Sequence, residues 1–173
     1  MPLDTMHDLM LDQLKDIYSA EQQLTKAIPK MAKKASNEEL VGAFRDHLAE
    51  TEQQVRRLDQ IFTKLDESPE NKKCKGMAGL IEEAEEILEE DGDAAVIDAA
   101  LIAAAQRVEH YEISAYGAVK AVAALLGHAD LVRLLDESQE EETAADKKLS
   151  LIATTDVNAR AAGTDPSMAA KAL

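Results

Sequence analysis

Apolar residues recur at intervals of three, four and seven positions along most of this chain, which is the spacing of one face of an α-helix. The first such stripe predicts a helix over residues 5–35. Thr5 and Asp8 match a capping box at its start, and Pro29 inside it is expected to kink the helix because proline has no backbone N–H. Aromatic residues make up only 3% of the chain, which favours helices over strands.

The second stripe predicts a helix over residues 36–65. Ser36 and Glu39 form an S-x-x-E capping box, so Ser36 is the expected N-cap of this helix. A polar loop over residues 67–76 follows, and then a short amphipathic helix over residues 77–90. The long connection after the second helix therefore carries a helix of its own.

Two further long stripes predict helices over residues 93–126 and 129–154, separated by the stop signal Gly127. Four long helices with one long connection in the middle indicate an all-α protein, an antiparallel four-helix bundle of the ferritin-like kind. In that arrangement two helix hairpins are joined by one crossover, here containing a short extra helix. We expect the bundle to occupy residues 1–155 and a tail, residues 156–173, to follow; the tail's pattern leaves a short helix and a frayed end equally open.

Three glutamates interrupt these stripes at positions where the seven-residue series calls for an apolar side chain: Glu21, Glu112 and Glu142. A buried ionised carboxylate costs several kcal/mol or more unless a partner compensates it. Three of them on three facing helices need a shared counter-charge, and the simplest one is a metal centre. The alternative is a buried polar network into which an Arg or Lys side chain reaches.

Further ligands are available on neighbouring helix turns. Glu109 lies three residues before Glu112 and therefore on the same face. The second helix offers His47 and Glu50, and the phase of its apolar stripe ranks His47 higher, because Glu50 shares a seven-residue series with Arg57 that looks exposed. The alternative for His47, and the better interpretation of this residue taken alone, is a hydrogen-bonded histidine between helices.

Asp146 follows Glu142 by four residues and is the remaining candidate ligand. Gln54 is expected to support a ligand rather than to bind metal itself. Three tyrosines near the glutamates could orient them by hydrogen bonds, although ordinary core packing is the better interpretation for Tyr111. They are Tyr18, Tyr111 and Tyr116.

The net charge is −15, with 34 acidic and 19 basic residues, which argues against partners rich in phosphate such as nucleic acids and anionic membranes. The N-terminus resembles no signal peptide and no run approaches the ~18 apolar residues of a membrane span, so a cytoplasmic protein is expected. Cys74 is the single cysteine and cannot form an intrachain disulfide. Its polar neighbours predict an ordinary surface residue, with a redox thiol as the alternative.

Four runs of this sequence resemble the YciE/YciF family of ferritin-like proteins: DIYSAEQQL (16–24), HLAETEQQVRRL (47–58), EHYEI (109–113) and EEETAADKKL (140–149). The resemblance covers about residues 4–155. It implies a ferritin-like bundle related to rubrerythrins, usually a homodimer, with a di-iron site. It also implies a link to bacterial stress responses but no particular biochemical activity.

Carried over residue by residue, the resemblance implies one carboxylate ligand on each of helices one, two and four and an E-x-x-E pair on helix three. These residues are Glu21, Glu50, Glu142, Glu109 and Glu112. The Glu-x-x-His pairs typical of such sites are missing, because Gln53 and Ala145 stand where the histidines should be. His47, Gln54 or Asp146 would have to substitute, and a ligand set this rich in oxygen makes manganese a candidate beside iron.

Three functions follow from these residues. The first is a protein that binds two metal ions, iron or manganese, and handles oxygen or peroxide under stress, with an unknown reductant as partner. The second is a structural or partner-binding bundle whose metal site is vestigial, which the missing histidines favour. The third is iron storage or DNA protection in a cage. The negative charge of the chain argues against the DNA role.

Overall fold

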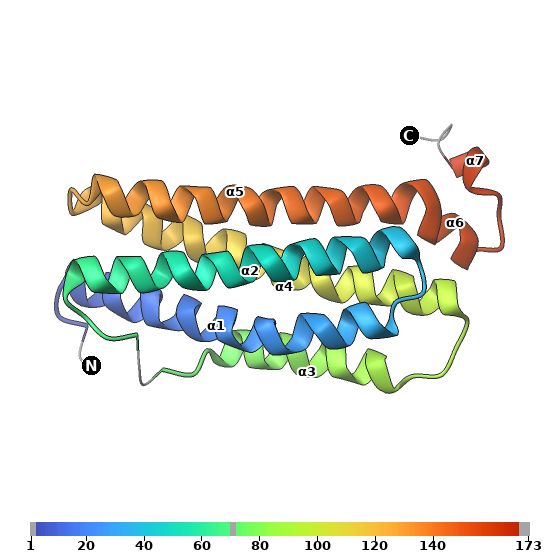
Figure 1. Cartoon of the computed structure of the whole chain (residues 1–173), viewed down its shortest axis with the longest axis horizontal. Coiled ribbons are helices and arrows are strands. Elements are labelled where there is room, and N and C mark those ends of the chain that lie inside the picture. Colours follow the sequence, from blue (N-terminus) through green and yellow to red (C-terminus); the bar gives the residue numbers. More distant parts are fainter. Residues whose placement is uncertain (1–2, 70–71, 170–173) are drawn as a thin grey trace.

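The computed structural model describes residues 3–69 and 72–169, which are helical with short connections and contain no strand (Figure 1). A π-helical segment, Ala153–Val157, extends the last long helix. The helices are α1 (Met6–Lys34), α2 (Glu38–Leu65), α3 (Lys75–Glu89), α4 (Ala94–Leu125), α5 (Ala129–Ile152), α6 (Asn158–Ala161) and α7 (Pro166–Ala169).

The four long helices form two hairpins, α1–α2 and α4–α5, and the connection between the hairpins runs from one end of the bundle to the other (Figure 1). Because of this crossover, α2 and α4 run in the same direction and lie diagonally opposite. Each long helix packs against two antiparallel neighbours, and α3 lies against α1 and α4. The all-α four-helix bundle with a helix in its crossover, predicted from the sequence, is confirmed.

The start of α1 follows its sequence signal. The Thr5 hydroxyl accepts a hydrogen bond from the Asp8 amide at 3.1 Å, and the Asp8 carboxylate accepts one from the Thr5 amide at 2.9 Å. This reciprocal pair is the predicted capping box. The α-helix continues through Pro29 and ends at Lys34.

The N-cap of α2 is Asn37, so the prediction of Ser36 was wrong. Asn37 accepts from the Leu40 amide at 3.0 Å. Ser36 instead donates its amide and its hydroxyl to Asp98 of α4, at 2.8 and 2.6 Å, and the Asn37 amide donates to the same carboxylate at 2.9 Å. A buried acid more than sixty residues away therefore determines the backbone at the α1–α2 turn.

The crossover also corrects the prediction for Cys74, which is fully buried and caps α3 two residues earlier than expected. Its thiol lies 2.9 Å from the hydroxyl of Tyr111, and its amide donates to the Ser19 hydroxyl at 2.9 Å. Gly76 is required beside it, because a Cβ there would lie 2.8 Å from the Tyr111 ring. The prediction of a surface residue rested on the polar sequence neighbours of Cys74, but the Cys74 side chain itself is directed into the interior.

The C-terminal segment, whose structure the sequence left open, contains the short helices α6 and α7 with a turn between them. The π-helical segment takes α5 beyond the predicted end near residue 154 and leads into α6. Val157 and Ala159 are buried, and α6 packs against α4. The part of the proposed tail closest to α5 therefore contributes to the packed interior.

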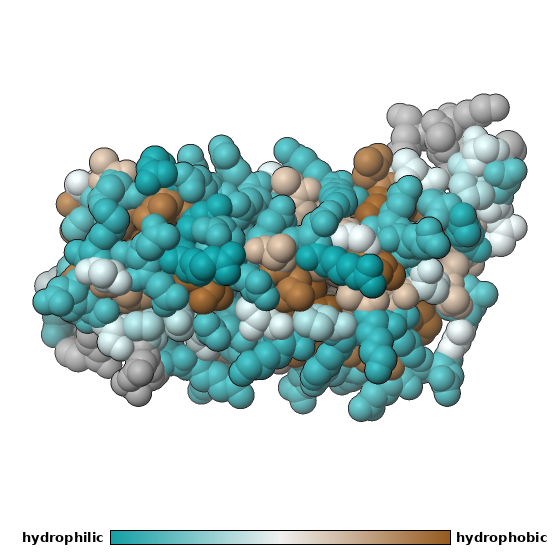
Figure 2. Space-filling model, viewed as in Figure 1, coloured by the Kyte–Doolittle hydropathy of each residue, from teal (hydrophilic) through white to brown (hydrophobic). Residues whose placement is uncertain are grey.

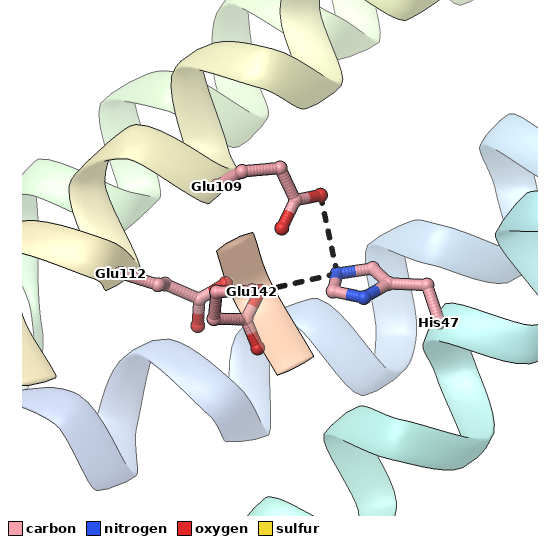
Figure 3. A group of neighbouring side chains, drawn as sticks. All are labelled: His47, Glu109, Glu112 and Glu142. Carbon is pink, nitrogen blue, oxygen red and sulfur yellow. Dashed lines mark ion pairs between the residues drawn. The ribbon is translucent and has the colours of Figure 1, made fainter. Parts of the chain in front are cut away.

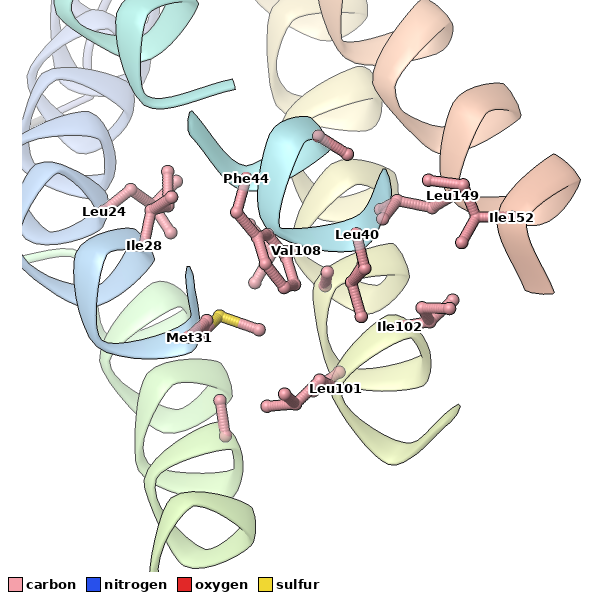
Figure 4. Packing of buried hydrophobic residues seen from close by; sticks show 14 of the residues in the cluster. Leu24, Ile28, Met31, Leu40, Phe44, Leu101, Ile102, Val108, Leu149 and Ile152 are labelled. Atoms are coloured by element: carbon pink, nitrogen blue, oxygen red, sulfur yellow. The ribbon is translucent and has the colours of Figure 1, made fainter. Parts of the chain in front are cut away.

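Two hydrophobic clusters fill the bundle, one toward each end. The first contains residues of α3 and of the parts of α1, α2, α4 and α5 next to it, and Figure 4 shows its packing. Figure 4 labels ten of its members: Leu24, Ile28, Met31, Leu40, Phe44, Leu101, Ile102, Val108, Leu149 and Ile152. The second is formed by Met10, Leu14, Ile17, Leu58, Ile61, Phe62, Tyr116, Val119, Ala123, Leu131, Leu134 and Leu135. The predicted glutamates lie between the two clusters, in the middle of the bundle.

The surface is mainly polar, with scattered hydrophobic side chains on the face that Figure 2 shows. Among the helices of the described residues, none has the length and apolar character needed to cross a membrane.

Candidate metal centre

The middle of the bundle contains four buried glutamates and one buried histidine, contributed by all four long helices. Glu21 and Glu142 are fully buried, Glu109 and Glu112 are 1% exposed, and His47 is 7% exposed. The seven-residue series place Glu21, Glu112 and Glu142 on the inner faces of α1, α4 and α5, as expected. The phase of α2 correctly ranked His47 as more buried than Glu50.

His47 of α2 points across the bundle toward the α4 and α5 carboxylates (Figure 3). Its Nε2 atom lies 3.3 Å from Oε1 of Glu109 and 3.9 Å from Oε2 of Glu142. One donor atom from each of four residues lies within 4.8 Å of the other three; they are His47, Glu109, Glu112 and Glu142. This convergence of one nitrogen and three carboxylates provides a set of ligand atoms that suits a divalent cation.

The buried polar atoms of this cluster are largely unpaired. Within the described residues, eight buried side-chain atoms have no hydrogen-bond partner, and all belong to the cluster or to its neighbour Gln54. They are Oε2 of Glu21, Nδ1 and Nε2 of His47, Oε1 of Gln54, Oε2 of Glu109, both Oε atoms of Glu112 and Oε2 of Glu142. Native proteins rarely leave such groups unpaired, because each costs about 1–3 kcal/mol. Metal ions would satisfy them, so the residues present fit a metal centre.

The electrostatics of the glutamates agree with this interpretation. Burial raises the pKa of Glu21, Glu109 and Glu112 well above the usual range, and the neighbouring carboxylates raise it further. Glu142 is the strongest such neighbour for Glu21, and it also acts on Glu109 and Glu112. Without a cation the site therefore favours protonated acids, and a bound cation reverses that preference.

His47 responds to two opposing effects. Burial lowers the pKa of His47, but the carboxylates of Glu50 and Glu142 outweigh it and leave the pKa above its usual value. Its ring is therefore held in place by acids on either side, with Oε2 of Glu50 3.8 Å from Nδ1.

Two predicted ligands lie outside the group of converging atoms. The side chain of Glu50 is 42% exposed and approaches the cluster only through His47. Asp146 accepts a hydrogen bond from Gln106 at 2.9 Å and lies 3.3 Å from Nε2 of His110. Its charge still acts on Glu109.

Comparison with known proteins decides the family. Residues 5–162 match the model of a domain of unknown function, DUF892. The chain is 47% identical to the protein YciF of Escherichia coli over 166 residues, which covers 93% of this chain and 98% of that protein. This chain belongs to the DUF892 family.

Solved structures of similar proteins agree with the fold. The crystal structure of E. coli YciF, described as a stress protein, matches with a TM-score of 0.86 over 90% of this chain and 98% of that one. YcfI of Rhodopseudomonas palustris, described as a proposed structural protein, is 50% identical, with a TM-score of 0.83 over 86% of this chain and 94% of that one. A protein of Xanthomonas campestris matches over 90% of this chain and 95% of that one with a TM-score of 0.72 at 18% identity, which shows a common fold alone.

In this DUF892 chain, hydrogen bonds from neighbouring side chains hold two of the glutamates. Tyr116 donates to Glu21, which confirms the predicted role of a tyrosine in orienting a carboxylate. Gln54 donates to Glu142 and, at 3.1 Å, to Glu141. The other two tyrosines act elsewhere: Tyr18 packs edge-to-face on Phe62, and Tyr111 donates to Asp16 at 2.7 Å.

Sequence reasoning missed Arg57 and Glu141. The side chain of Arg57 is only 12% exposed, so the interpretation of its series as exposed was wrong at this position. It donates two hydrogen bonds of 2.6 Å to Glu141, whose carboxylate also accepts from Gln54. The sequence carries only a partial signal: Arg57 follows Gln54 by three residues and Glu141 precedes Glu142, which places each near the cluster without pairing the two. The guanidinium neutralises Glu141, and among the described residues no Lys or Arg forms an ion pair with the four buried glutamates, which leaves His47 as their one ion-pair partner able to carry a positive charge.

Proposed function

We propose that this protein binds two divalent metal ions, iron or manganese, in the buried cluster and handles oxygen or peroxide during stress. The observation that carries the proposal is the set of eight unpartnered buried atoms, counted within the described residues, around one histidine and four glutamates. Such a group is unfavourable in a metal-free protein and becomes favourable once cations occupy it.

Charge supports two ions rather than one. Glu21, Glu109, Glu112 and Glu142 carry four negative charges when ionised, and two divalent cations carry four positive ones. Glu112 interacts electrostatically with Glu21, Glu142 and Glu109, and both of its oxygens lack a hydrogen-bond partner within the described residues, so it would hold metal together with these glutamates. His47 completes the set, and Glu50 and Asp146, which lie outside the group of converging atoms, stay predicted ligands.

Each neighbouring side chain has a defined task in this proposal. Tyr116 fixes one oxygen of Glu21, and Gln54 fixes one oxygen of Glu142, so the second oxygen of each stays free to bind. The Arg57–Glu141 pair holds Gln54 in position. The hydrophobic clusters close the bundle on both sides of the site, and iron or manganese bound between them would supply redox chemistry that no side chain of this cluster can supply.

The link to stress comes from the E. coli relative, which is described as a stress protein and is 47% identical. A homodimer, a cytoplasmic location and an unidentified reductant partner belong to the same proposal. Light scattering of the purified protein tests the dimer, and a mass of twice 18.8 kDa is expected.

A structural role with a vestigial site is the second candidate. Two observations favour it: the cluster lacks both Glu-x-x-His pairs, and the R. palustris relative is described as a proposed structural protein. This candidate predicts a metal-free protein whose melting temperature does not change when chelator is added and which does not consume peroxide.

Metal loading of Glu112→Gln separates the candidates. The purified protein is loaded anaerobically with Fe²⁺ or Mn²⁺, desalted and measured by elemental analysis. We expect two ions per chain in the wild type, at most one in Glu112→Gln, and two in the control Glu140→Gln, which removes an exposed carboxylate of α5. Loading well below two per chain in the wild type, or unchanged loading in Glu112→Gln, would refute the two-metal site.

A further inference from the structure

A cavity of about 400 Å³ lies between α2 and α5, directly beside the candidate metal centre. Small and apolar side chains form most of its wall: Ala43, Phe44, Ala49, Ala144, Ala145 and Leu149. Four alanines, two on each of the facing helices, leave space that larger residues would fill. The volume falls in the range of pockets that bind small organic molecules and far exceeds the roughly 30 Å³ that one water occupies.

The inner end of this cavity reaches the metal centre. His47 and Glu109 form part of its wall, and they lie 3.3 Å apart at Nε2 and Oε1. Both ring nitrogens of His47 and one oxygen of Glu109 have no hydrogen-bond partner within the described residues. The buried polar groups of the cavity wall therefore lie at its deep end, and Figure 3 shows His47 directed toward the carboxylates of the metal centre.

The outer end is charged on both sides. Lys148 of α5 donates to Asp46 of α2 at 2.7 Å, and Glu50 lies beside them. The lysine is already paired, and the acids near the cavity outnumber it. With a net charge of −15 on the chain, an anionic ligand is repelled, whereas a neutral ligand is not.

We propose that this cavity binds a small neutral organic molecule with an apolar body and a single O–H group, a hydroxyl or hydroperoxide, directed at His47. The alanine-rich wall holds the apolar body, and the unpartnered nitrogen and oxygen at the deep end hold the polar group. The inference extends the proposed function, because it names the class of molecule that reaches the metal centre. The binding itself depends only on the cavity.

Primary alcohols from propanol to octanol are the probes, titrated into the metal-free full-length protein and followed by NMR. Each added methylene should tighten binding roughly threefold to fourfold until the cavity is full. Hexanoate should bind at least about tenfold more weakly than hexanol, because the acids repel it. Affinity that does not rise with chain length, or equal affinity for hexanoate, would overturn the proposal.

Ala145→Leu places extra carbon atoms in the cavity and should weaken hexanol binding at least about tenfold. Ala121→Phe, which enlarges an exposed alanine on α4, is the matched control and should bind like the wild type. Unchanged binding in Ala145→Leu contradicts the assignment of the cavity. The alcohol series in the wild type gives an independent answer if this variant folds poorly.

Orientation is measured on protein loaded with Mn²⁺, whose unpaired electrons accelerate relaxation of nearby protons. The hydroxymethyl protons of hexanol should relax faster than its terminal methyl protons, and the opposite order would overturn the proposed orientation. If alcohols bind with the expected chain-length dependence but Mn²⁺ does not bind, the cavity stands and the proposed metal function fails.

Discussion

Glu112 lies on α4 with both carboxylate oxygens buried and, among the described residues, without a hydrogen-bond partner. Burial and the charges of Glu21 and Glu142 raise its pKa well above the usual range. In metal-free protein at neutral pH this residue must either take up a proton or remain as an unpaired charge, and both lower stability. The residues best suited to bind metal are therefore those that destabilise the empty site.

Glu112→Gln should stabilise the metal-free protein by about 1–3 kcal/mol, because it removes a buried acid without removing volume. Urea unfolding in the presence of EDTA at pH 7 measures the change. The control Glu140→Gln is expected to stay within about 0.5 kcal/mol of the wild type. A destabilised Glu112→Gln would show that this carboxylate makes a favourable interaction in the metal-free state.

Cys74 should be almost inert in the native protein. Its side chain is fully buried, and burial raises the pKa of its thiol. Alkylation by iodoacetamide at pH 8 should be at least about tenfold slower than in urea-unfolded protein. Comparable rates in the two states would place Cys74 at the surface, where its polar sequence neighbours had put it.

At the scale of the helices, periodicity predicted each long helix to within a few residues, because each presents one continuous apolar face to the same core. The errors arose where a distant side chain decided the local structure. Ser36 hydrogen-bonds to Asp98 instead of forming the predicted capping box, and Cys74 is buried in contact with the hydroxyl of Tyr111. The partners in these two contacts are 62 and 37 residues apart in the sequence, so a local sequence pattern cannot predict them.

Asp98→Ala should destabilise the protein by about 2–4 kcal/mol, because the buried donors of Ser36 and Asn37 lose their acceptor. Thermal unfolding of the chelated protein measures the effect. The control is Asp91→Ala in the exposed loop before α4, with an expected change within about 0.5 kcal/mol. Equal stability of the two variants would mean that Asp98 does not hold the α1–α2 turn.

At the scale of the whole molecule, the buried charges lie between two hydrophobic clusters, and their positions follow from four independent helix phases. Phase predicted which glutamates turn inward. It could not predict that Asp146 would meet Gln106 and His110, or that Arg57 would be buried against Glu141, because these depend on how two helices face each other.

The stability of the metal-free protein should fall as pH rises from 5 to 8. Glu21, Glu109 and Glu112 have folded pKa values above their unfolded value of 4.5, so the folded state binds more protons than the unfolded state in this window. The lowered pKa values of Asp8, Asp130 and Asp165 act only below their usual 3.8. Urea unfolding in EDTA at several pH values measures the slope.

The metal-loaded protein should show the opposite slope, because protons compete with metal for the same carboxylates and acid therefore removes the stabilising ion. Parallel slopes with and without metal would mean that the ions bind away from the buried glutamates.

Anomalous diffraction from crystals of manganese-loaded protein tests the central claim most directly. The account predicts two anomalous peaks per chain in the middle of the bundle, both among Glu21, His47, Glu109, Glu112 and Glu142. Crystals soaked to saturation that show no anomalous peak among these residues would contradict it.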